Sequence, residues 1–97
     1  MAAYLLAVCD VTNPNENFKK YIGLSGAMIE KHGGKYVVRG PAKKNLKGDL
    51  LESKIVIITE WPSLDAIDTF LNDPEYVNEV VPLRDGTGEY HFAAYES

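Results

Sequence analysis

The chain has 97 residues, of which 45% are hydrophobic and 25% charged, and it carries a formal net charge of −4 at pH 7. This length suits a single domain, residues 1–97, and this balance is typical of a folded globular protein rather than a disordered one. The acidic charge disfavours nucleic acid as a partner, because nucleic-acid surfaces are usually met by a basic face.

The first nine residues are apolar, contain no basic residue, and are too few to span a bilayer. We therefore interpret them as a buried strand, and we expect no membrane partner. Cys9 is the only cysteine, so it has no partner for an internal disulfide. This cysteine usage favours a reducing compartment, and we expect the protein in the cytoplasm.

A long amphipathic helix follows the first strand, which we predict at residues 4–11. Asn13 is placed to cap this helix, Pro14 suits its first turn, and Glu16 completes a capping box. Gly33 is placed to end the helix in the left-handed conformation. The stripe that recurs at steps of three and four residues comprises Phe18, Tyr21, Ile22, Ser25, Met28, Ile29 and His32.

The rest of the chain alternates strands, turns and shorter helices. Runs of β-branched and aromatic residues predict the strands, and clusters of Gly, Pro and polar residues predict the turns. Ser63 is placed to cap a second helix, and Asp73-Pro74 begins a further helical piece that ends near Val81. The predicted strands are residues 35–39, 54–60 and 89–95, and the segment 41–52 is a long hairpin connection.

The resulting order, β-α-β-β-α-β, is the split βαβ arrangement of ferredoxin-like domains, an α+β fold with a four-stranded antiparallel sheet. Two helices can cover only one face of such a sheet. Yet residues 5–9 and 55–58 are apolar at odd and even positions alike, whereas alternation is expected if one face meets water. We therefore predict that the second face packs against the same face of a second copy, which makes a homodimer.

No motif in the chain names a reaction. Metal-ligand spacings, a phosphate-binding glycine loop and a nucleophile elbow are all absent, so we predict no metal and no cofactor. His32 lies in the last turn of the long helix, and it is either a histidine that the helix dipole favours or a metal or haem ligand. His91 lies in the last strand, and it is either a structural sheet histidine or an acid or base that lines an interior.

One arginine and several aromatic residues are the best candidates for a binding site. Arg39 follows a predicted strand and precedes Gly40-Pro41, so its head group lies near an end of the sheet. Arg39 and Glu60 either form a structural pair or together anchor the carboxylate, phenol or carbonyl group of a small ligand. The aromatic residues that could line an apolar pocket with hydroxyl tips are Tyr21, Trp61, Tyr76 and Phe92.

Three motifs, Gly33–Gly40, Glu60–Ser63 and Asp73–Tyr76, resemble those of the family called domain of unknown function 1330, within the dimeric α/β-barrel superfamily. The resemblance implies two ferredoxin-like subunits joined sheet to sheet around a central barrel. It assigns no activity, because the superfamily includes cofactor-independent monooxygenases, lactone isomerases, polyketide cyclases, haem-degrading enzymes and ligand-sensing domains. The matching positions are Arg39, Glu60, Pro62, Glu75, Tyr76 and Arg84, and the departures are Pro41, Lys54 and Trp61.

Three functions follow from these observations and stay open at this point. The first is a protein that binds a small organic ligand, aromatic or acidic, in a pocket between sheet and helices. The second is a cofactor-independent enzyme of monooxygenase, isomerase or cyclase type, in which His91, Glu60 or a tyrosine hydroxyl moves protons. The third is a structural or partner-binding dimer without a ligand. The residues expected at a ligand site are Arg39, Glu60, Trp61, Tyr76, Tyr21, His91 and Arg84.

Overall fold

The structure, a computed structural model, describes residues 2–97. Its elements in chain order are β1 (Ala3–Val11), α1 (Glu16–Lys31), β2 (Lys35–Pro41), β3 (Ile55–Trp61), α2 (Leu64–Leu71), η1 (Tyr76–Val80), η2 (Val81–Arg84) and β4 (Gly88–Glu96). The first short segment, η1, has π-helical hydrogen bonds, and η2 has 3-10 hydrogen bonds. This order confirms the predicted β-α-β-β-α-β arrangement.

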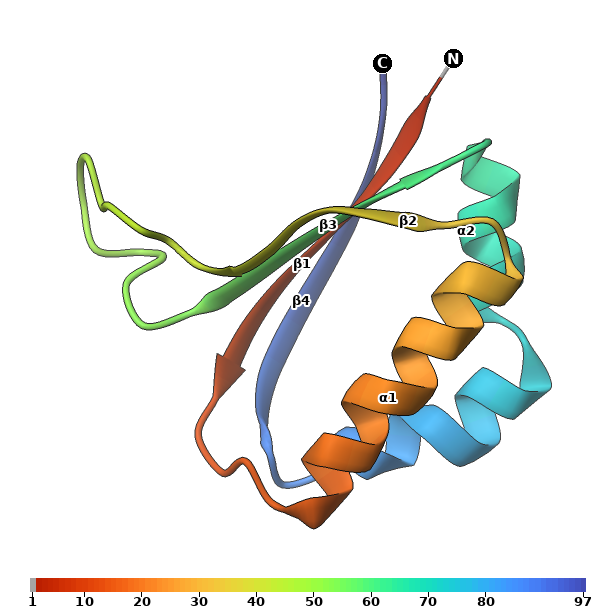
Figure 1. Cartoon of the computed structure of the whole chain (residues 1–97), viewed down its shortest axis with the longest axis horizontal. Helices are drawn as coiled ribbons and strands as arrows, with labels where there is room; N and C mark the ends of the chain where they lie inside the picture. Colours follow the sequence, from red (N-terminus) through yellow and green to blue (C-terminus); the bar gives the residue numbers. More distant parts are fainter. Residues whose placement is uncertain (1) are drawn as a thin grey trace.

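The four strands form one antiparallel sheet in the order β2-β3-β1-β4. β1 lies inside the sheet and pairs with both β3 and β4, so the first and last strands of the chain are neighbours (Figure 1). The β-branched run of β3 and the apolar run of β1 suit these two inner positions, where each strand pairs with a neighbour along both of its edges. The predicted ferredoxin-like α+β fold is therefore confirmed.

All the helices lie on one side of the sheet, as Figure 1 shows. On that inner face, alternate β1 residues such as Leu5 and Ala7 are buried. The residues between them, such as Leu6 and Val8, are half-buried on the outer face, which no helix of residues 2–97 covers. The apolar character of β1 at both odd and even positions therefore corresponds to one face against the helices and one bare apolar face.

The densest part of the core surrounds Trp61 at the end of β3. Its side chain is 2% exposed, and its Nε1 donates a hydrogen bond to Thr59 Oγ1 at 2.8 Å. Thr59 Oγ1 in turn donates to the carbonyl oxygen of Leu5 at 3.4 Å. The residues that make up this core are Ala3, Leu5, Met28, Ile29, Trp61, Ile67, Phe70, Tyr76 and Val80.

The start of α1 differs from the prediction, because Asn15 and not Asn13 caps the helix. Asn15 Oδ1 accepts a hydrogen bond from the Phe18 backbone N–H at 2.9 Å. Asn13 instead binds the turn before β4, with its backbone N–H on the Thr87 carbonyl and its side chain on the Gly86 carbonyl. This tie holds Asn13 outside the helix, so the helix begins later and the predicted capping box does not form.

The end of α1 and the start of α2 agree with the sequence interpretation. Gly33 has a φ of 89°, which is the left-handed conformation expected after the helix. Ser63 caps α2, and its Oγ accepts a hydrogen bond from the Ala66 backbone N–H at 3.1 Å. Local sequence signals therefore define both helix boundaries.

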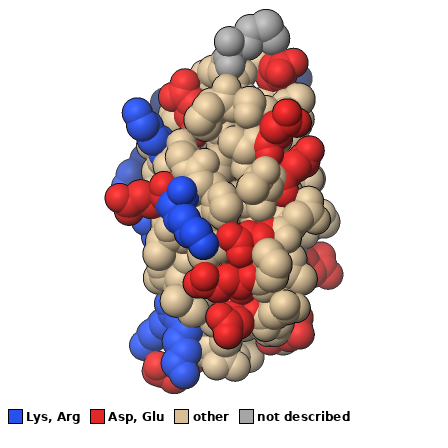
Figure 2. Space-filling view, turned by 90° about the vertical axis from the view of Figure 1, so that its right-hand side faces the viewer, with Lys and Arg blue, Asp and Glu red and all other residues tan. Residues whose placement is uncertain are grey.

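The outer surface of the helical layer is rich in acidic side chains, which Figure 2 shows as red patches on this side of the molecule. Among the exposed carboxylates of α1, α2 and η1 are Glu30, Asp65, Asp68 and Glu79. This surface is suited to water and is unfavourable for a polyanion. No helix within residues 2–97 is long and apolar enough to cross a membrane.

Gly34 permits the close approach of α1 to Trp61, and this contact leads to a stability prediction. A Cβ at position 34 would lie 2.7 Å from Ile29 Cγ2 and 2.8 Å from Trp61 Cζ2. We expect Gly34→Ala to lower the free energy of unfolding by about 1–3 kcal/mol, as overpacked cores do. Urea denaturation followed by tryptophan fluorescence measures this change.

Gly23→Ala is the matched control, because a Cβ there has no atom within 4 Å and α1 is helical at that position. We expect this variant to raise the free energy of unfolding by up to about 1 kcal/mol through helix propensity. Equal effects of the two substitutions would contradict the packing described for Gly34.

Candidate functional site

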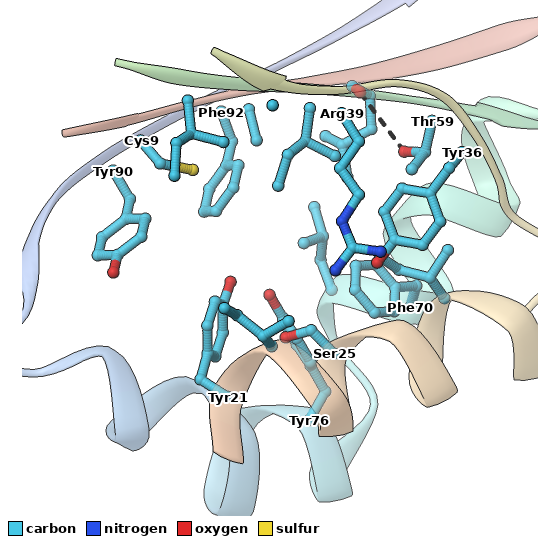
Figure 3. Close-up of a pocket in the computed structure, with 18 of the residues that line it drawn as sticks. Cys9, Tyr21, Ser25, Tyr36, Arg39, Thr59, Phe70, Tyr76, Tyr90 and Phe92 are labelled. Carbon is cyan, nitrogen blue, oxygen red and sulfur yellow. Dashed lines mark hydrogen bonds between the residues drawn. The ribbon is translucent and has the colours of Figure 1, made fainter. Parts of the chain in front are cut away.

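A cavity of about 390 Å³ lies between the inner face of the sheet and the helical layer, beside the Trp61 core. Its walls are mainly apolar, and Figure 3 shows the labelled side chains turned toward one shared space. The sheet contributes Leu5, Ala7, Cys9, Tyr36, Arg39, Gly40, Ile55, Ile57, Thr59, Tyr90 and Phe92. The helical layer contributes Phe18, Tyr21, Ile22, Ser25, Ile29, Phe70, Leu71 and Tyr76.

A β-bulge in β2 places Arg39 in this cavity. Tyr36 pairs with Thr59, but the next paired residue is Val38, opposite Ile58, so one extra residue is inserted between them. Side chains three positions apart on a regular strand point to opposite faces. The extra residue restores a common face, so Tyr36 and Arg39 both line the cavity, and the Arg39 Cζ lies 4.6 Å from the Tyr36 ring centroid.

Three hydroxyl groups enter the cavity from the helical layer. Tyr21 and Ser25 lie one turn apart on α1, and Tyr76 begins η1; Figure 3 shows their oxygens directed toward the space below the sheet. Ser25 is 8% exposed, yet its Oγ has no hydrogen-bond partner within residues 2–97. A buried hydroxyl without a partner loses hydrogen bonds to water and gains none from the protein, so it is available to a ligand.

Three titratable groups of the cavity, those of Cys9, Tyr76 and Tyr90, have raised pKa values that favour their protonated forms. Burial raises the pKa of the Cys9 thiol, although the nearby Arg84 guanidinium lowers it by a smaller amount. Burial also raises the pKa of the Tyr76 hydroxyl well above its usual range, and the adjacent Tyr21 hydroxyl adds to this shift. For Tyr90, burial raises the pKa more than the hydrogen bond with Thr87 lowers it. At neutral pH these groups therefore donate hydrogen bonds and do not act as bases.

Arg84 lies at the β4 end of the cavity, although it is not one of the residues that line it. Its Cζ is 5.0 Å from the ring centroid of Phe92, 5.4 Å from that of Tyr90 and 5.6 Å from that of Tyr21. The guanidinium is thus held against three aromatic rings that themselves line the cavity. Its Nη1 is buried without a hydrogen-bond partner, and Arg84 forms no ion pair within residues 2–97.

The structure brings some of the predicted site residues together and separates others. Tyr21, Arg39 and Tyr76 line the cavity, and Arg84 contacts its wall. Trp61 belongs to the core beside the cavity, where its ring centroid lies 5.1 Å from that of the lining residue Phe70.

Glu60 and His91 lie on the outer face of the sheet, and this corrects their expected place at the ligand site. Glu60 stands between two residues that are buried on the inner face, Thr59 and Trp61, so strand alternation directs it outward. His91 stands between Tyr90 and Phe92, which both line the cavity, so it also points outward. Neither residue can reach a ligand in this cavity.

The predicted pair of Arg39 and Glu60 is wrong for the same reason. Arg39 is opposite Ile57 in the sheet, while Glu60 is opposite Lys35 at the other end of β2. Their side chains lie on opposite faces, and Arg39 has no ion-pair partner within residues 2–97. The charge of Arg39 is therefore not neutralised by the chain.

Several cavity residues were absent from the predicted site, namely Ser25, Tyr36, Cys9 and Tyr90. A signal existed for two of them, because Ser25 lies on the stripe of α1 and Tyr90 shares its strand face with Phe92. His32 lies outside the cavity, and its Nε2 is 2.8 Å from Asp73 Oδ2. This hydrogen bond lowers the pKa of the Asp73 carboxyl and joins the end of α1 to the segment before η1.

No three His, Cys, Asp or Glu side chains of residues 2–97 are grouped to hold a metal ion.

The raised pKa and burial of Cys9 predict slow alkylation of the folded protein. Because the chain has a single cysteine, iodoacetamide labelling reports this site alone. At pH 8 we expect the folded protein to react at least about tenfold more slowly than the chain unfolded in guanidinium chloride, since the thiolate is the reactive form. Mass spectrometry measures the labelling rate of each form. Equal rates for the folded and unfolded chains would contradict the burial of this thiol.

Comparisons with solved structures show which known proteins share this fold. A protein of unknown function from Rhodopseudomonas palustris, RPA0582, is 25% identical, with a TM-score of 0.75 over 99% of this chain and 82% of that chain. SnoaB, a cofactor-independent oxygenase from Streptomyces nogalater, is 16% identical, with a TM-score of 0.68 over 99% of this chain and 92% of that chain. A nipsnap family protein of unknown function from Agrobacterium tumefaciens is 16% identical, with a TM-score of 0.64 over 99% of this chain and 87% of that chain.

The similarity to SnoaB and to the nipsnap family protein shows a shared fold and nothing more about activity. Among curated proteins, no sequence matches this chain significantly. The family described as domain of unknown function (DUF1330) matches residues 2–96, which is nearly the whole chain. The chain therefore belongs to the DUF1330 family.

Proposed function

We propose that this protein binds a small organic molecule, aromatic or acidic, in the cavity between its sheet and its helices. The observation that carries this proposal is an apolar cavity that contains the unpartnered Ser25 hydroxyl and Arg39, which has no ion-pair partner within residues 2–97. Small-molecule sites are typically concave, about 300–1,000 Å³ in volume, mostly apolar, and oriented by a small number of polar groups. The cavity of about 390 Å³ has each of these properties.

The polar groups of the cavity favour an acidic or electron-rich ligand. Arg39 supplies a positive charge, and the hydroxyls of Tyr21, Ser25 and Tyr76 supply hydrogen-bond donors. Among the residues that line the cavity there is no aspartate or glutamate to neutralise that charge. A carboxylate, phenolate or enolate group would pair with Arg39, while the aromatic walls would pack on the rest of the molecule.

Binding is better supported than catalysis by the groups that the cavity contains. His91 and Glu60, which were the candidate acid and base for an enzyme, lie on the outer face of the sheet. Burial raises the pKa of the Tyr76 and Tyr90 hydroxyls, so these two groups hold their protons at neutral pH. The fold shared with an oxygenase at 16% identity does not supply a reaction for this chain.

We further propose that two copies form a homodimer through the outer face of the sheet. This face presents Leu6, Val8, Val56 and Ile58, which are half-buried, and Val38, which is 45% exposed. A bare apolar face of this extent is unfavourable in water, and the same face of a second copy is the simplest surface of matching chemistry.

We further propose that the protein works in the cytoplasm, because its single cysteine can form no internal disulfide.

The binding proposal predicts that a planar aromatic acid stabilises the protein. We expect 2-naphthoate to raise the melting temperature, and Arg39→Met to weaken its affinity by about tenfold or more, because a charge-assisted hydrogen bond is lost. Isothermal titration calorimetry measures the affinity, and a thermal-shift series extends the search to other planar acids.

Lys43→Met is the matched control, since it removes the same charge from the exposed connection between β2 and β3. Ser25→Ala provides a second variant, and we expect it to leave stability unchanged or higher, because its hydroxyl has no partner in the protein. Absence of a thermal shift with every planar acid tried would contradict the proposed function.

The dimer proposal predicts twice the mass of one chain in native mass spectrometry of untagged protein. We expect Ile58→Glu to shift the protein toward a monomer, because Ile58 lies opposite Leu6 near the middle of the outer face. Leu24→Glu is the control, since Leu24 is an exposed apolar residue of α1 on the helical layer. A monomeric wild-type protein would contradict the proposal.

A further inference from the structure

We propose that the ligand is an elongated, planar molecule with an acidic group at each end, one paired with Arg39 and the other with Arg84. This inference rests on the proposed function, because it specifies the chemistry of the molecule that the same cavity takes. It follows from the positions of two cations, neither of which has an ion-pair partner within residues 2–97.

The two arginines lie at opposite ends of a single row of side chains across the sheet. Arg39 pairs with Ile57, Ile57 with Ala7, and Ala7 with Phe92, so these four residues stand side by side on the inner face. Arg39 belongs to the edge strand β2, and Phe92 belongs to the opposite edge strand β4. The guanidinium of Arg84 lies over the Phe92 ring at 5.0 Å, so it marks the far end of the same row.

The length of this row sets the scale of the ligand. Three inter-strand steps separate β2 from β4, which amounts to roughly 14 Å between the two edge backbones. Arg39 reaches the cavity from β2, whereas Arg84 belongs to η2 and approaches the Phe92 ring from the helical layer, so this span sets only the order of magnitude of the ligand's length. Lining residues are exposed at both edges, with Tyr36 38% exposed and Phe92 40% exposed, and a linear molecule can therefore extend from one edge to the other.

The middle of the row favours a flat, unsaturated body. Ala7 and Ile57 form an apolar surface on the sheet side, and Ala7 is the smallest residue of the row, which leaves the space deepest at the centre. On the opposite wall, the hydroxyls of Tyr21, Ser25 and Tyr76 face the same space. A ring system would pack on the sheet side, while a carbonyl or hydroxyl group along its edge would bind these three donors.

Arg84 is more than a structural cation on aromatic rings. Contact with rings satisfies the charge in part, but it leaves the N–H groups of Nη1 without an acceptor. The other buried side-chain atom of residues 2–97 without a partner is Ser25 Oγ, and Ser25 lines the cavity whose wall Arg84 contacts. Both unpartnered atoms are therefore explained by one ligand that lies across the cavity.

The experiment compares three rigid aromatic diacids of increasing length with their monoacids. The diacids are benzene-1,4-dicarboxylate, naphthalene-2,6-dicarboxylate and biphenyl-4,4′-dicarboxylate, and the monoacids are benzoate, 2-naphthoate and biphenyl-4-carboxylate. We expect at least one diacid to bind about tenfold or more tightly than its monoacid, because it makes a second charge-assisted pair. Isothermal titration calorimetry of the wild-type protein gives this ratio for each length.

The variants Arg84→Met and Arg84→Lys test whether Arg84 pairs with the second acidic group of the ligand. We expect Arg84→Met to reduce the diacid-to-monoacid affinity ratio to about one, and Arg84→Lys to retain part of it through its charge. A cavity that merely loosened would weaken diacid and monoacid alike and leave the ratio unchanged. The carbonyl of residue 84, which accepts hydrogen bonds from Thr87, is present in every variant, and thermal melts establish that each one folds.

The outcomes separate the two proposals. Monoacid binding without any advantage for a diacid of any length would overturn the two-ended ligand and leave the proposed binding function in place. A diacid advantage that persists in Arg84→Met would overturn the role of Arg84. Absence of binding by all six acids would overturn the proposed function and this inference with it.

Discussion

The indole of Trp61 holds the helical layer at its distance from the sheet, and the cavity depends on that spacing. The side chain is almost fully buried, its Nε1–H is satisfied by Thr59, and its ring packs against Phe70 of α2 and against the backbone at Gly34. A bulky, rigid ring at one end of the interface therefore separates the two layers, while Ala7 further along β1 is too small to fill the resulting gap. The dense core and the empty space beside it are two consequences of one packing arrangement.

Much of the fold could be predicted from the sequence because its signals are local. The amphipathic stripe of α1, the left-handed Gly33 after it and the cap at Ser63 depend on neighbouring residues, and the structure has all three. The start of α1 was misplaced because two asparagines compete for the cap. Asn13 is drawn away by hydrogen bonds to the turn before β4, more than seventy residues later in the chain. A local pattern contains no information about such a distant partner.

The candidate site could be predicted only in part, because strand parity does not reveal which face meets the helices when both faces are apolar. Tyr90 and Phe92 share one face and His91 has the other, yet the composition of β4 leaves either choice open. The face of Arg39 is harder to predict. Regular alternation places Arg39 on the same face as Val37, but the bulge puts it on the face of Tyr36. The approach of Arg84 to three rings, one from α1 and two from β4, is a tertiary feature that spacing along the chain cannot supply.

The cavity lowers the free energy of unfolding of the protein without a ligand, and this loss connects stability with the proposed binding function. Empty apolar space forfeits packing contacts, and the unpartnered Ser25 hydroxyl and Arg84 guanidinium forfeit hydrogen bonds. A molecule that fills the space and pairs with these groups restores both the packing contacts and the hydrogen bonds. It binds only the folded state, because the unfolded chain does not bring these groups together. Its binding therefore adds directly to the free energy of unfolding. The proposed ligand would therefore stabilise the fold at the place where the protein itself leaves polar groups unpaired.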